Sequence, residues 1–108
     1  MAEKRNQVID KVKDYLKRVN QKYPVDKAIL FGSYAAGKTH RSSDIDLAIF
    51  SRVITDRNRL KIAADMLRET SAYRLDIQPL VFSYREYLSG ENDFIRDQIK
   101  RKGIVVFG

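Results

Sequence analysis

Residues 32–39 read Gly-Ser-Tyr-Ala-Ala-Gly-Lys-Thr, and residues 44–50 read Asp-Ile-Asp-Leu-Ala-Ile-Phe. The small residues of the first stretch are typical of a turn, and the apolar run of the second is typical of a strand. Asp44 and Asp46 lie two positions apart, and strand side chains alternate between faces, so both carboxylates are predicted to point the same way. Because two hard oxygen ligands on one face suit Mg²⁺, the sequence predicts a metal site beside a phosphate-binding turn.

Periodic apolar residues on both sides of this stretch predict a chain that alternates helices and strands. The order αβαβαβ, with small additions, predicts the α/β or α+β class, with a small mixed sheet and helices packed on it. Since proline cannot donate a ladder hydrogen bond, Pro79 is predicted to lie in an edge or bulged strand. The predicted helices are 3–22, 34–36, 55–71, 84–88 and 92–102, and the predicted strands are 25–31, 44–51, 74–82 and 104–107.

The predicted helix over residues 55–71 has apolar residues on more than one side. Thr55 or Asp56 is expected to cap its first turn. Ile62 and Met66 widen the apolar side, either as a patch that faces a partner or as part of a broad buried face. The predicted core face itself consists of Leu60, Ala63, Ala64 and Leu67.

The composition fits one globular domain over residues 1–108, because no linker, internal repeat or low-complexity run divides the chain. The absence of cysteine excludes disulfides, thiolate metal sites and cysteine nucleophiles. No signal peptide or membrane-spanning apolar run is found, so a soluble cytoplasmic protein with no membrane partner is expected. The formal net charge of +7 favours a polyanion, whether nucleotide, nucleic acid or acidic protein surface, without choosing among them.

Asp76 is a third candidate for the metal site, because it is a polar residue between Leu75 and Ile77 in the third predicted strand. If this strand pairs beside residues 44–51, Asp76 reaches the same edge as the other two aspartates. Three carboxylates around two Mg²⁺ ions about 4 Å apart would bind a nucleoside triphosphate and activate an acceptor hydroxyl. The reaction class is in-line attack on the α-phosphorus, which depends mainly on positioning and electrostatics.

Gly32 and Ser33 are the candidates for binding the triphosphate. Glycine permits close approach of the backbone to a phosphate, and Ser33 offers a hydroxyl and a backbone N–H at the start of the short predicted helix. We therefore expect these two residues to hold the triphosphate tail.

The Gly-Ser turn followed by the Asp-x-Asp strand resembles the signature of the DNA polymerase beta-like nucleotidyltransferase superfamily, especially its minimal one-domain members. The similarity runs from about residue 25 to residue 82. By this resemblance, Gly32 and Ser33 match the triphosphate-binding turn, and Asp44 and Asp46 match the paired metal ligands. Asp76 matches the third carboxylate, which activates the acceptor hydroxyl.

The turn departs from the pattern of many relatives, which carry an arginine where this chain has Tyr34 or Ala36. Lys38 and Arg41 in the following loop are the candidates to supply the phosphate-neutralising charge instead. We include both among the predicted nucleotide-binding residues.

The resemblance implies an Mg²⁺-dependent enzyme that moves AMP from ATP onto a hydroxyl. Minimal members are frequently antitoxins that bind an all-helical HEPN-type toxin and adenylylate it on tyrosine. The implied partner is therefore such a toxin, in a hetero-oligomer. A second hypothesis is a binding module that neutralises its partner by occlusion without chemistry, as the altered turn suggests. A third is nucleotide addition to RNA, which only the positive charge favours.

Residues 32–39 also satisfy the Walker A pattern Gly-x-x-x-x-Gly-Lys-Thr. A P-loop requires a helix that begins at the Lys-Thr pair. Only four residues separate Thr39 from Asp44, which leaves no room for that helix. The P-loop interpretation therefore fails on its structural context.

Overall fold

The computed structural model describes residues 2–32, 35 and 44–108. Its helices and strands follow one another in the order that the sequence predicts, apart from the helix expected over 34–36, which lies outside the described residues. The elements are α1 (Ala2–Lys22), β1 (Lys27–Phe31), β2 (Ile45–Ser51), α2 (Arg59–Glu69), the 3₁₀ helix η1 (Thr70–Tyr73), β3 (Ile77–Ser83), α3 (Tyr84–Ser89), the π-helix η2 (Ile95–Lys100) and β4 (Ile104–Phe107).

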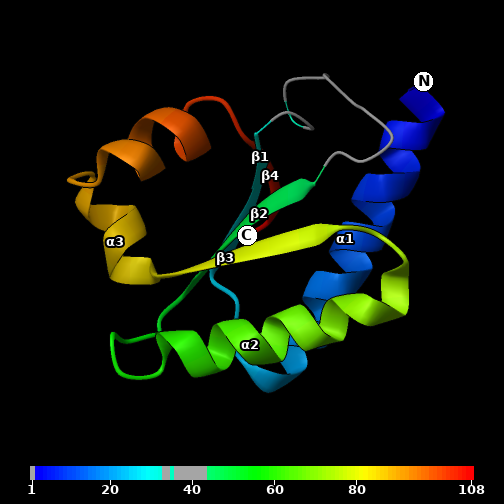
Figure 1. The fold of residues 1–108 in the computed structure, drawn as a ribbon. Helices are drawn as coiled ribbons and strands as arrows, with labels where there is room; N and C mark the ends of the chain where they lie inside the picture. Colours follow the sequence, from blue (N-terminus) through cyan, green and yellow to red (C-terminus); the bar gives the residue numbers. More distant parts are fainter. Residues whose placement is uncertain (1, 33–34, 36–43) are drawn as a thin grey trace.

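The four strands form one mixed sheet in the order β3-β2-β1-β4 (Figure 1). β1 pairs antiparallel with both β2 and β4, whereas β2 and β3 run parallel. The mixed sheet and its packed helices confirm the predicted fold class. β3 lies at an edge, as Pro79 predicts, because the missing N–H then disrupts no ladder on the outer side.

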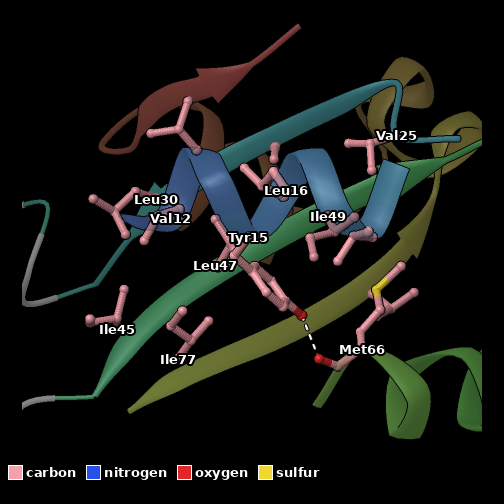
Figure 2. Packing of buried hydrophobic residues seen from close by; sticks show 14 of the residues in the cluster. Val12, Tyr15, Leu16, Val25, Leu30, Ile45, Leu47, Ile49, Met66 and Ile77 are labelled. Atoms are coloured by element: carbon pink, nitrogen blue, oxygen red, sulfur yellow. Dashed lines mark hydrogen bonds between the residues drawn. The ribbon is translucent and has the colours of Figure 1, made fainter. Parts of the chain in front are cut away.

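The helices α1 and α2 cover one face of the sheet (Figure 1). The alternating residues Ile45, Leu47 and Ile49 of β2 point to this face and pack in its core. Tyr15 of α1 is fully buried there, and its hydroxyl donates a hydrogen bond of 2.6 Å to the backbone oxygen of Met66 in α2 (Figure 2). This contact ties the two helices together across the core.

The opposite face carries a second, smaller cluster under α3 and η2. It consists of Ile29, Phe31, Ala48, Phe50, Ile95 and Ile99. Since strand side chains alternate, Asp46 shares this second face with Ala48 and Phe50. The half-buried side chain of Asp46 therefore lies on the same side of the sheet as α3 and η2.

The predicted core face of α2 is wrong. Leu60 and Leu67 are 85% and 50% exposed, whereas Ile62 and Met66 are 4% and 1% exposed. Both stripes have helical spacing, so the sequence pattern alone does not separate them. The contacts with α1 select the second stripe, because Met66 meets Tyr15 there. Of the other two residues predicted for the core face, Ala63 is half-buried and Ala64 is exposed.

The predicted cap of α2 is also corrected. The helix begins at Arg59 after the N-cap residue Asn58, which makes no side-chain cap hydrogen bond. Thr55 instead exchanges hydrogen bonds with Asn58, because its N–H donates to Asn58 Oδ1 at 2.7 Å and its Oγ1 accepts from the Asn58 N–H at 3.4 Å. The side chain of Asp56 ion-pairs with Arg59. The helix ends at Glu69 and continues as η1, two residues beyond the predicted limit.

Among the described residues, no helix combines the length and the apolar character that crossing a membrane requires.

Candidate functional site

The site begins where β1 ends and β2 starts. Asp46 lies opposite Phe31 in the antiparallel pair, and Gly32 follows Phe31 with φ of +76°. A Cβ at Gly32 would lie 3.2 Å from Cγ of Asp46 and would overlap its Oδ2. The backbone of Gly32 therefore closes directly on the carboxylate of Asp46, and only glycine fits both the space and the left-handed conformation.

The two aspartates of the motif differ in their surroundings. Asp44 is exposed just before β2, and Asp46 is half-buried within it. Burial and, secondarily, the nearby charge of Asp44 raise the pKa of Asp46 above its usual value. Two like charges held together in this way favour a cation between them.

Asp76 lies beside this pair. β3 runs parallel to β2 with Ile77 opposite Ile45, and the backbone oxygen of Asp76 accepts the N–H of Ile45 at 2.8 Å. The strand neighbourhood that the sequence analysis required is therefore present. The side chain of Asp76 is exposed. Over residues 2–32, 35 and 44–108, no three histidine or carboxylate side chains converge into a ready-made metal site. The catalytic and metal-binding roles of the three aspartates stay predictions.

Of the four residues predicted to bind the nucleotide, the structure describes Gly32. Ser33, Lys38 and Arg41 lie outside the described residues.

Two side chains that the sequence analysis did not select lie close to this site. Gln78 pairs in register with Asp46 and is exposed. It lies two residues beyond Asp76, so the alternation of the strand was a signal for it. Phe94 packs edge-on against Phe31, with ring centroids 5.8 Å apart. No local pattern predicts the contact between Phe31 and Phe94, because the two residues are distant in the sequence.

A family model described as "Polymerase beta, Nucleotidyltransferase" matches residues 10–108. The matched range includes the Gly-Ser turn, the strand with Asp44 and Asp46, and Asp76.

Two proteins of Methanocaldococcus jannaschii are similar in sequence, and both are named "Putative protein adenylyltransferase". One is 29% identical over 103 residues, which are 93% of this chain and 99% of the relative. The other is 31% identical over 86 residues, which are 75% of this chain and 56% of the relative.

Solved structures share the fold. A Sulfolobus solfataricus protein described as a "putative nucleotidyltransferase" has a TM-score of 0.65 and 19% identity, with 96% of this chain and 83% of that chain covered. A toxin–antitoxin complex crystallised with AMP-PNP gives a TM-score of 0.60 at 22% identity, covering 89% and 73%. A variant of the MntA–HpeT toxin–antitoxin pair with two aspartate-to-glutamate substitutions gives 0.59 at 20% identity, with the same coverage.

Proposed function

The chain belongs to the polymerase beta nucleotidyltransferase family, and from this membership we propose that it transfers AMP from ATP to a hydroxyl of a partner protein. The observation that carries the proposal is the pair of aspartates at the start of β2, with the backbone of Gly32 closing on the carboxylate of Asp46. Asp76 directly precedes β3, the neighbouring parallel strand. The names of the two Methanocaldococcus relatives support a protein as the acceptor.

The residues at this edge of the sheet fit Mg²⁺. Asp44, Asp46 and Asp76 offer only oxygen donors, which Mg²⁺ prefers. Burial first, and then the charge of Asp44, raise the pKa of Asp46, and a bound divalent cation would offset both effects by stabilising the ionised carboxylate. We propose that the three aspartates hold two Mg²⁺ ions, which when bound stabilise the charge that develops on the phosphates.

In the proposed reaction, the acceptor oxygen attacks the α-phosphorus in line, and the bond from this phosphorus to the oxygen shared with the β-phosphate breaks. Pyrophosphate leaves with the bonding electron pair, and Asp76 takes the hydroxyl proton. Gly32 and Ser33 hold the triphosphate tail through backbone N–H groups. Lys38 and Arg41 are proposed, from the sequence alone, to neutralise its charge.

The partner we propose is a HEPN-type toxin that is modified on a tyrosine and held in a hetero-oligomer, with this chain as the antitoxin. Two of the solved structures that share the fold are toxin–antitoxin complexes, one of them crystallised with AMP-PNP. The two aspartates substituted in the other complex have the same two-residue spacing as Asp44 and Asp46. This agreement supports Asp44 and Asp46 as the functional pair of aspartates in this chain.

The test uses ATP labelled separately at the α- or the γ-phosphate, with Mg²⁺, the candidate toxin and RNA. Stable α-label on a toxin tyrosine, absent with Asp46→Asn, is the expected result. The matched control is Asp10→Asn, because Asp10 is an exposed aspartate of α1 outside the site, and this variant should transfer label normally. Full transfer by Asp46→Asn would refute the metal site.

Other distributions of label correspond to the alternatives. α-Label in RNA would move the assignment to RNA modification. A stable complex in which neither label moves, and in which Asp44→Asn/Asp46→Asn still neutralises the toxin, would favour occlusion. The turn without an arginine is the observation that favours this second candidate.

A further inference from the structure

Phe94 differs from every other phenylalanine of the chain. All five are among the described residues, and four of them are buried or half-buried, whereas Phe94 is 46% exposed. Exposing an aromatic ring forgoes much of the stabilisation that its burial would give. Packing in the core therefore does not account for a phenylalanine at the start of η2.

The contact with Phe31 puts Phe94 near the carboxylates. Phe31 is the cross-strand partner of Asp46, and side chains on one face at such positions start roughly 5 Å apart. The rings of Phe31 and Phe94 are 5.8 Å apart and nearly perpendicular, with an interplanar angle of 86°. The ring of Phe94 therefore lies on the same face of the sheet as Asp46, with Phe31 as the residue that connects them.

The local backbone also fits a ligand site. Phe94 is the N-cap residue of η2, a π-helix of six residues. π-Helical turns are rare and are found frequently at functional sites. Ile95 and Ile99 fix η2 to the sheet by packing in the second cluster, so Phe94 is held on a supported element while its ring stays open to solvent.

We propose that the base of the bound nucleotide stacks on Phe94. This inference rests on the proposed nucleotide site at Asp44 and Asp46 and adds to it the residue that binds the base. In the proposed arrangement the triphosphate lies at the carboxylates and the base lies on the ring of Phe94. Because every base has a π-face, stacking tolerates different bases and requires no reading of base edges.

The test compares ATP with tripolyphosphate, which carries the same phosphate chain and no base. Binding of each to the protein is measured by calorimetry in the presence of Mg²⁺, without an acceptor. Phe94→Ala is expected to weaken ATP binding about five- to 150-fold and to leave tripolyphosphate binding unchanged. Phe94→Trp is expected to restore ATP binding, since tryptophan offers a larger stacking surface.

The matched control is Leu88→Ala in α3. Leu88 is a large hydrophobic residue that is also exposed, at 65%. It follows the C-terminal end of β3, whereas Asp76 directly precedes the N-terminal end of that strand. This variant is expected to bind both ligands as the wild type does. Thermal melting of each variant checks that the fold is kept.

Several results would overturn the proposal. They are unchanged ATP affinity in Phe94→Ala, parallel loss of ATP and tripolyphosphate affinity, or failure of Phe94→Trp to recover the ATP affinity that alanine loses. In each case the nucleotide site itself would stand. If the wild-type protein bound neither ligand, or if Asp46→Asn bound both normally, the proposed nucleotide site would fall and the stacking role with it.

Discussion

Gly32→Ala tests the contact between the turn and the carboxylate most directly. At φ of +76°, an alanine costs about 1–2 kcal/mol relative to its preferred backbone conformation. The added Cβ also overlaps Oδ2 of Asp46, and moving that side chain off its rotamer costs about 1 kcal/mol more. The expected loss in the free energy of unfolding is therefore about 2–3 kcal/mol in urea denaturation. Because the displaced carboxylate is a proposed Mg²⁺ ligand, Mg²⁺-dependent ATP binding should also be lost.

Gly90→Ala is the matched control. Gly90 has φ of +69°, close to that of Gly32, and a Cβ there would meet nothing within 4 Å. This variant should lose only about 1–2 kcal/mol and should bind ATP normally. A double-mutant cycle isolates the clash, because in an Asp46→Ala background Gly32→Ala should cost no more than Gly90→Ala. Equal losses for the two glycine variants in the wild-type background, or ATP binding retained in Gly32→Ala, would refute the reasoning.

Three further predictions concern stability. Tyr15→Phe leaves the buried backbone oxygen of Met66 without its hydrogen bond and should cost about 1–3 kcal/mol in urea unfolding; a loss near zero would contradict the contact. Ile62→Ala should lower the free energy of unfolding by about 2–4 kcal/mol and Leu60→Ala by less than about 0.5 kcal/mol. A larger loss for Leu60→Ala would instead support the core face that the sequence predicted. Lys22 of α1 donates a hydrogen bond to Glu69 and lowers the pKa of this carboxyl below its unfolded value. The ionised Glu69 therefore stabilises the fold above the unfolded pKa, and this stabilisation is lost as the pH falls through the folded pKa. Unfolding of Glu69→Gln should therefore depend less on pH between about 5 and 3 than unfolding of the wild type, and identical profiles would exclude this role.

The paired aspartates were accessible to sequence analysis because their geometry is local. Residues two positions apart along a strand share a face, and β2 alternates in this way, because Ile45 and Leu47 pack in one cluster and Ala48 and Phe50 in the other. The position of Asp76 beside the pair depends on β3 pairing with β2. The residues around Asp76 give no information about the order of the strands in the sheet. The contact of Phe94 with Phe31 is less accessible still, because it depends on how η2 packs on the finished sheet.

The fold was predicted well at the level of elements and less well at the level of faces. Strand β4 has the predicted bounds, and α1 agrees to within one residue at its start. The error on α2 arose because Leu60 and Ile62 both belong to stripes with helical spacing. Hydrophobicity does not decide between such stripes, since the neighbour against which a helix packs is set by tertiary structure.

The helices that cover the two faces of the sheet are made at different times during synthesis. The ribosome makes α1 before the strands that it covers, whereas η2 is made after β1, β2 and β3. Ile29, Phe31 and Phe50 therefore lack two of their packing partners at first. Ile95 and Ile99 are synthesised several seconds later at ordinary rates of translation. During that interval an apolar surface beside Asp46 is open to other chains. The nascent protein is thus expected to need protection from aggregation until Ile95 and Ile99 have emerged.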